Sequence, residues 1–282
     1  MPLSALQAKL LRLLAAQRKS DSMVAGAAPL SRIGPRTSDD IDIFHTRAEN
    51  VAAAAQADYA VLEAAGYRCH WARREPALWT AVIADDRGET RLEWVHDSDF
   101  RFFPAVPDVD FGYVLHPADI ATNKTLAAAG RREPRDAVDL VLVHEKILPL
   151  GAAIWAAVAK DPGWSPESLL AEIRRSNRYH DDDLVPLKMS RQITAAELSR
   201  KLRAALNEAE AFVLKMPSEK AGLLFLDGDR LVQPDPSRLD DYRMHAGQHG
   251  GHWPSSSEIA SAMLEAWSRI GDQRAGTTIP RK

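Results

Sequence analysis

Hydrophobic and polar positions alternate along residues 37–45, which read TSDDIDIFH. Successive side chains of a strand point to opposite faces, so Ile41 and Ile43 share one face and Asp40 and Asp42 share the other. Aspartate is depleted in strands, and neighbouring like charges repel. The pattern therefore predicts a strand with one buried face and one face on which two carboxylates lie close together.

The first half of the chain alternates between helical and strand-like periods. Leucines at helical spacing predict an amphipathic helix over about residues 3–14. A short apolar run at residues 23–25 meets Gly26, after which we expect a further helix. The remaining pattern predicts an alanine-rich helix at 47–65, strands at 67–72, 77–84 and 90–95 with a hairpin turn at 85–88, and helices at 117–130 and 135–145.

The second half is mainly helical. Ser165-Pro166-Glu167 is a strong helix start, with an N-cap, a first-turn proline and an acid at the positive end of the dipole. Asp227-Gly228 between two apolar runs predicts a β-hairpin. Other helices are expected at 149–159, 194–214 and 256–269. The predicted fold class is α+β, with a domain of mixed sheet and helices over residues 1–145 and a mainly helical domain with a small β-hairpin over residues 146–282.

Composition narrows the class of protein. Of 282 residues, 27% are charged and 45% hydrophobic, as in ordinary globular proteins, and the net charge of −3 means that nucleic-acid binding would need a local basic patch. The single cysteine, Cys69, excludes an intrachain disulfide and a zinc site built on several thiolates. Lys9 and Arg12 interrupt the N-terminal apolar run, and no run reaches the roughly 20 residues that span a bilayer. We expect a cytoplasmic protein with no membrane partner.

The carboxylate pair is a candidate metal site. Asp40 and Asp42 repel each other unless a cation lies between them, and hard oxygen ligands suit Mg²⁺ or Mn²⁺. An EF-hand loop starting at Asp40 is excluded, because Phe44 and His45 occupy positions that would need an acid or amide and a glycine. A solvated edge strand with acidic decoration remains the alternative.

The neighbouring residues extend this pattern. A glycine turn at Gly26 followed by Asp-x-Asp on a strand resembles the layout of polymerase-β-like nucleotidyltransferases, in which backbone N–H groups approach a phosphate. Such enzymes have a third carboxylate on a neighbouring strand. In ETRLEWV (89–95), Glu93 faces away from Leu92 and Trp94 and is the candidate; an ordinary exposed strand glutamate is the alternative.

Four segments resemble the AbiEii-type nucleotidyltransferases, toxins of abortive-infection toxin–antitoxin systems. They are VAGAAPL (24–30), RTSDDIDIF (36–44), DIATNK (119–124) and REPRDAVDL (132–140). The resemblance covers about residues 20–145. It implies transfer of NMP from an NTP to an acceptor, either an RNA end, tRNA in particular, or a protein hydroxyl. It also implies a phage-defence setting with a cognate antitoxin.

The resemblance also implies residue roles. Asp40 and Asp42 would hold the metal ions, with Glu93 as the third ligand. Ser38 would lie beside the nucleotide phosphates with Gly26 and Ala27. Lys124 would contact the triphosphate and Asp136 would be the acidic partner, approaching each other across a helical hairpin. Arg135 and Asp139 would orient or brace these groups. Without the motifs, Lys124 would be interpreted as a surface lysine and Asp136 as a helix-start acid.

One departure from the family keeps a second function open. The glycine pair of the family appears here as Gly26-Ala27, so a methyl group could crowd a phosphate. The alternative function is a catalytically inactive nucleotide-binding or partner-binding regulator of a toxin–antitoxin or phage-defence system.

Two further groups attract functional interpretations. Basic residues of the helical half could form a phosphate-contacting face. They alternate with acids, however, as on a solvated helix. The basic residues are Arg174, Arg175, Arg178, Lys188, Arg191, Arg200, Lys201 and Arg203. His245, His249 and His252 in HAGQHGGH suggest zinc, but their loose spacing and intervening glycines favour a loop that the glycines permit, near the nucleotide or RNA.

Overall fold

The computed structural model describes residues 3–272, which divide into two compact units. The first unit contains the described residues up to 99, with 104–115 and 187–191. The second contains 100–103, 116–186 and the described residues from 192 onward. Helices α3 (Pro117–Gly130) and α4 (Pro134–Lys146) belong to the second unit, although a boundary after residue 145 would assign them to the first domain.

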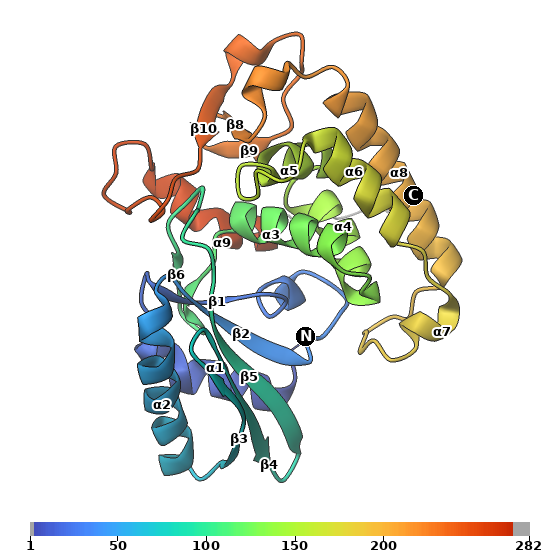
Figure 1. The fold of residues 1–282 in the computed structure, drawn as a ribbon. Helices are drawn as coiled ribbons and strands as arrows, with labels where there is room; N and C mark the ends of the chain where they lie inside the picture. The colour runs from blue at the N-terminus through green and yellow to red at the C-terminus, as the bar shows by residue number, and fades with distance from the viewer. Residues whose placement is uncertain (1–2, 273–282) are drawn as a thin grey trace, which may run out of the picture. The chain divides into compact units, whose positions relative to one another are not determined.

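The first unit is built on a mixed seven-stranded sheet of order β3-β4-β5-β2-β1-β7-β6 (Figure 1). Strand β2 runs parallel to β5, and β1 runs parallel to β7, while the other neighbours are antiparallel. The strands are β1 (Ser22–Ala25), β2 (Asp40–His45), β3 (Arg68–Glu75), β4 (Leu78–Asp85), β5 (Gly88–His96), β6 (Val106–Asp108) and β7 (Gly112–Val114). The predicted α+β class is confirmed, and the pattern did not reveal the short strands β1, β6 and β7.

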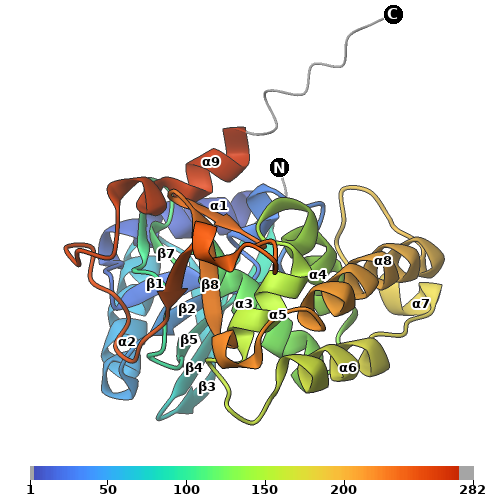
Figure 2. The same cartoon turned by 90° about the horizontal axis from the view of Figure 1, so that it is seen from above.

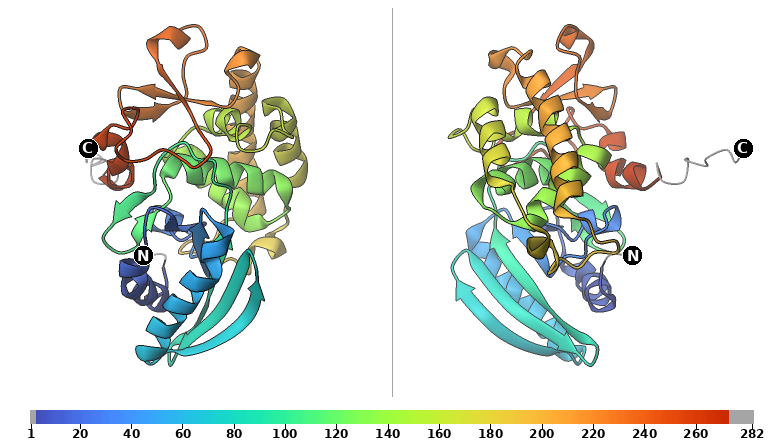
Figure 3. Two further views of the ribbon diagram at one scale, coloured as in Figure 1. Left: turned by 60° about the vertical axis from the view of Figure 1, so that its left-hand side comes forward. Right: turned by 90° about the vertical axis from the view of Figure 1, so that its right-hand side faces the viewer.

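Two helices cover the sheet face that the apolar alternation predicted. Helices α1 (Ala5–Leu14) and α2 (Ala48–Ala64) contact each other and β5, and α2 crosses the strands in Figure 3. Trp94 is fully buried there and donates a 2.7 Å hydrogen bond from its indole to Asp58 of α2. The side chains of Arg18 and Asp58 also pair in this interior. Since strand side chains alternate, the polar residues of β2 and β5 face the other way.

The prediction of a helix after Gly26 is wrong. The chain turns there and forms only a 3₁₀ segment at Leu30–Arg32. Gly26 has a φ of 62°, which breaks the helical path, and Pro29 and Pro35 bound a segment too short for an α-helix.

The second unit is mainly helical, as predicted, with α5 (Leu150–Ala157) at its centre. Every residue of α5 is buried, and the helix contacts α3, α6 and α8 (Figure 2). The other helices are α6 (Pro166–Ser176), the short α7 (Asp181–Leu184) and α8 (Ala195–Val213). The expected hairpin, β8 (Leu223–Asp227) and β9 (Arg230–Val232), gains a third strand, β10 (Arg243–Ala246), which lies beside β8.

The last helix begins later than predicted. Residues 256–260 are not helical, a 3₁₀ turn covers Ser261–Glu265, and α9 spans Ala266–Asp272. Pro254 and three consecutive serines precede the segment, and both residue types favour turns over helix interiors.

Within residues 3–272, no single helix is long and apolar enough to cross a membrane. Helices α4 and α5 meet that criterion only when joined, and they are bent by 111° at the break between them.

Candidate functional site

Three predicted carboxylates come together on the polar face of the sheet in the first unit. In the parallel pairing of β2 with β5, Asp42 is opposite Glu93 and Asp40 is opposite Arg91. One carboxylate oxygen from each of Asp40, Asp42 and Glu93 lies within 4.8 Å of the others. Asp40 and Asp42 are brought together by the two-residue period of one strand, and Glu93 by the register of the next.

Gly26 lies against this carboxylate group. Residue 25, the last of β1, is opposite Asp42, and Gly26 follows it with a φ of 62°. A Cβ on Gly26 would lie 1.7 Å from Oδ2 of Asp42, a distance that no side chain can occupy. The backbone of the turn therefore approaches the carboxylate as closely as only glycine allows.

Ser38 holds Asp40 from the loop that precedes β2. Its buried hydroxyl donates a 3.0 Å hydrogen bond to Oδ1 of Asp40. The loop is itself fixed by Gln7 of α1, whose amide donates to the Ser38 carbonyl at 2.9 Å and to Thr90 of β5 at 3.1 Å. The hydrogen-bond chain from Gln7 to Asp40 positions one carboxylate against the neighbouring strand.

Basic side chains lie beside the carboxylate group and the loop before β2. Arg91 places one guanidinium nitrogen 3.4 Å from Asp40, with about half of its side chain exposed. Asp39, whose side chain is partly exposed, pairs at 2.9 Å with Lys188, from the stretch 187–191 that lies beside residues 35–37 through backbone hydrogen bonds. The three carboxylates are a donor set that fits a hard divalent cation.

The second unit contains the other two predicted site residues. Lys124 of α3 lies 2.8 Å from Asp139 and 3.6 Å from Asp136 of α4, and all three side chains are buried. The predicted approach of Lys124 and Asp136 is confirmed, but Asp139 is the closer partner. Arg131, which sequence reasoning missed, donates to Asp136 at 2.7 Å and 3.2 Å. Its position between Gly130 and Pro134, in the link between the two helices, was the available signal.

An arginine-rich groove of about 550 Å³ opens beside this pair in the second unit. Its lining contains one acid, Glu172, and four arginines, Arg131, Arg132, Arg175 and Arg178. Burial, with the nearby Asp136 charge, raises the pKa of Tyr179 to about 12, and the Arg132 guanidinium lies over the ring of Tyr179. Arg175 and Arg178 were two of the basic residues singled out in the sequence, whereas Arg131 and Arg132 were not.

Comparison with known proteins gives two structural likenesses at low sequence identity. A protein from H. pylori assigned as a nucleotidyltransferase is 15% identical over 74% of this chain and 93% of its own, with a TM-score of 0.45. MenT4, a nucleotidyltransferase toxin from Mycobacterium tuberculosis H37Rv, is 14% identical over 94% of this chain and 91% of its own, with a TM-score of 0.43. No protein-family model and no curated protein sequence matches the chain. Both likenesses are at or below 15% sequence identity, so the chemistry of this chain has to be argued from its own residues.

Proposed function

We propose that the protein is a metal-dependent nucleotidyltransferase. It would transfer the NMP part of an NTP to an acceptor hydroxyl and release pyrophosphate. The observation that carries the proposal is the meeting of the Asp40, Asp42 and Glu93 carboxylates within 4.8 Å, directly beside the Gly26 turn. A solvated acidic strand would not need a neighbouring strand to supply a third carboxylate in register, nor a glycine packed against the second.

Asp40, Asp42 and Glu93 would hold Mg²⁺ or Mn²⁺ as oxygen ligands. Divalent ions in such a site lower the pKa of an attacking hydroxyl and neutralise charge on the transferring phosphoryl group. The protein contributes the position of the ligands. Ser38 holds Oδ1 of Asp40, and Gln7 holds the loop that carries Ser38.

The turn at Gly26-Ala27 would bind the nucleotide phosphates through its backbone. The absence of a side chain at Gly26 leaves the main chain of the turn against Asp42. Backbone N–H groups in a glycine turn are suited to phosphate oxygens. Ala27 keeps its N–H and has no positive φ, so its methyl group imposes no backbone strain.

Lys124 and Asp136 enter the proposal through the family resemblance, with Lys124 as the triphosphate contact and Asp136 as its acidic partner. Their salt bridge in the second unit is compatible with either a catalytic or a purely structural role. The two roles predict different effects of one substitution: a structural lysine affects stability alone, whereas a catalytic lysine also affects the KM for NTP.

The acceptor would be an RNA end, with tRNA as the leading candidate. Support comes from the arginine groove of the second unit. Arg131 pairs there with Asp136 and Arg175 with Glu172, and Arg132 and Arg178 add further positive charge to the local basic patch that a chain of net charge −3 needs for phosphate binding. Such transfer onto RNA would make the protein a toxin, and a cognate antitoxin would be its protein partner.

The proposal is tested by incorporation of each labelled NTP into total RNA in the presence of Mg²⁺. Asp42→Asn and Asp40→Asn, which keep side-chain shape, should each lower incorporation by at least about hundredfold, as loss of an electrostatic group in an active site does. Asp39→Asn is the matched control, because Asp39 is adjacent in sequence but pairs with Lys188. Equal activity of the wild type and Asp42→Asn would reject the site.

The same assay separates the alternative function. A regulator without catalytic activity would bind an NTP with Mg²⁺, raising its melting temperature, and would incorporate none of the four nucleotides. Growth arrest on expression that disappears in Asp42→Asn would support the toxin, whereas arrest that persists would indicate action through binding alone.

A further inference from the structure

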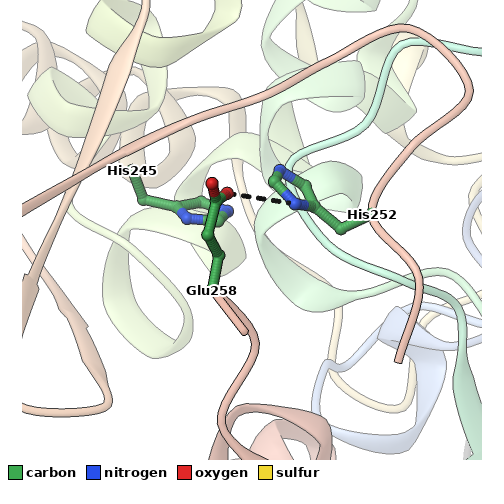
Figure 4. Close-up of side chains that lie close together, drawn as sticks. All are labelled: His245, His252 and Glu258. Atoms are coloured by element: carbon green, nitrogen blue, oxygen red, sulfur yellow. Dashed lines mark ion pairs between the residues drawn. The ribbon is translucent and has the colours of Figure 1, made fainter. Parts of the chain in front are cut away.

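A second group of metal-ligating side chains lies in the second unit. One ligand atom from each of His245, His252 and Glu258 is within 4.8 Å of the others, and Figure 4 marks the ion pair of the Glu258 carboxylate with His252 by a dashed line. His245 lies on β10, and the other two lie in the coil that follows. Gly250 and Gly251, with φ of 78° and 69°, reverse the chain so that His252 returns to His245. In the sequence, the intervening glycines were interpreted as evidence against a metal site. In the structure, Gly250 and Gly251 form the turn that brings His252 to His245.

Backbone carbonyls fix the orientation of both rings. Nε2 of His245 donates to the Phe102 carbonyl, and Nε2 of His252 donates to the Ala246 carbonyl at 3.0 Å. A carbonyl only accepts, so Nε2 must carry the hydrogen, and in the neutral ring Nδ1 then carries the lone pair. A histidine that binds a metal through one nitrogen commonly donates from the other in this way.

His252 also has a buried atom that the protein leaves unsatisfied. Its side chain is 2% exposed, and among residues 3–272 its Nδ1 has no hydrogen-bond partner. Oε2 of the Glu258 carboxylate lies 3.4 Å from this nitrogen. A ring lone pair and a carboxylate oxygen are both acceptors, so this approach is stabilised only by a cation or a proton between them.

We propose that His245, His252 and Glu258 bind a zinc ion. Two imidazole nitrogens and one carboxylate oxygen are a donor set typical of zinc, whereas Mg²⁺ prefers oxygen ligands alone. The Glu258 side chain is 65% exposed, so it is free to close on an ion that needs ligands at about 2.0–2.2 Å, and water can complete the coordination. The ion would tie the coil after β10 to that strand. This site is separate from the carboxylates of the first unit and takes a different metal.

The proposal is tested on the full chain without an affinity tag, stripped with a chelator and titrated with Zn²⁺ against a chromophoric competitor. The wild type should bind one tight equivalent. Glu258→Gln and His252→Gln should each weaken binding by at least about tenfold, since even indirect supports of a metal site cost that much. His249→Gln is the matched control, because His249 is exposed on the same loop and is not in the group, and it should bind as the wild type does.

Glu258→Gln keeps the experiment decisive if His252→Gln does not fold, because Glu258 is largely exposed. Zn²⁺ should raise the melting temperature of the wild type and of His249→Gln but not of Glu258→Gln. The proposal is overturned if the wild type binds no zinc under these conditions, which would leave a proton-mediated ion pair, or if His249→Gln loses as much affinity as Glu258→Gln.

Discussion

At the scale of single residues, Gly26 is a position where the structure does not accommodate a side chain. Its φ of 62° and the 1.7 Å clash of an added Cβ with Asp42 predict two effects of Gly26→Ala. The backbone conformation alone should cost about 1–2 kcal/mol of unfolding free energy. Displacement of Asp42 should abolish nucleotide transfer. Urea denaturation and labelled-NTP incorporation measure the two effects, and a variant that kept full activity would show that the turn does not position Asp42.

Ala27 gives the complementary prediction. Ala27 has no positive φ and is buried, so its methyl group is packed without strain. Because removal of this methyl group relieves no strain, we expect Ala27→Gly to change the KM for NTP by no more than about threefold. A change of that size corresponds to less than about 1 kcal/mol of binding free energy. A large gain in activity on restoring the glycine pair would instead show that the methyl group crowds a phosphate and that the native chain is impaired.

Lys124 is a residue whose predicted role and observed contacts differ. The sequence motif assigns it to a triphosphate, but its ammonium lies 2.8 Å from Asp139 in a buried setting. Lys124→Met should therefore lower the unfolding free energy by about 3 kcal/mol, because it leaves buried carboxylates without that cation. Lys201→Met, which breaks a more exposed pair with Glu145, should cost less than about 1 kcal/mol.

Stability and activity together assign the role of Lys124. If Lys124→Met folds with lower stability and keeps its KM for NTP, the salt bridge is structural. If the KM rises at a temperature where the variant is fully folded, the lysine also contacts the nucleotide.

At the scale of elements, the sequence predicted the helices and strands whose formation depends on residues close together in the chain. The alternation of residues 37–45 gave the strand and both of its faces, because burial selects one period for the apolar side chains. Helix α3 was marked by its first-turn proline, Pro117, whereas α4 begins at Pro134, one residue before the predicted start. Strands β6 and β7 have three residues each, which is too few for a two-residue period to be recognised. Strand β10 was not predicted because its partner, β8, ends 16 residues earlier in the chain.

The N-terminus of α3 predicts a pH dependence. His116 is its N-cap, and Nδ1 accepts from the Ala118 N–H while Nε2 donates to the Met263 carbonyl. Burial lowers the pKa of His116 from its ordinary value of 6.5 to about 4. The unfolded chain therefore binds the proton first, so stability is fully present above pH 6.5 and is lost as pH falls toward 4, by up to about 3 kcal/mol.

His116→Asn isolates this contribution, because asparagine keeps an N-cap acceptor and does not titrate. His45 in the first unit, whose pKa burial also lowers to about 4, contributes equally to the wild type and the variant. The variant should therefore lose less unfolding free energy than the wild type between pH 7 and 5 in urea titrations. Parallel curves for the two proteins would contradict a neutral buried His116.

At the scale of the whole molecule, the chain passes back and forth between its two units. A single boundary in the sequence therefore cannot divide the chain into these units. Residues 100–103 belong to the second unit, where the N–H groups of Phe102 and Phe103 donate to buried Asp119. Residues 187–191 belong to the first, where Lys188 and Ser190 bond the loop before β2. Both assignments depend on partners far away in sequence. For the same reason, the sequence suggested His249 as a ligand, whereas the structure brings Glu258 to His245 and His252.

This division predicts that the two proposed metals act on different units. Hydrogen exchange followed by mass spectrometry should show Zn²⁺ alone slowing exchange in peptides covering residues 243–259 and 100–103, because the ion would fix β10 and the coil that follows it. Mg²⁺ with an NTP should slow exchange in residues 22–45 and 88–96 of the first unit. Glu258→Gln should lose only the first effect and Asp42→Asn only the second. If one variant lost both effects, the two sites would be a single coupled system, and their assignment to separate units would be wrong.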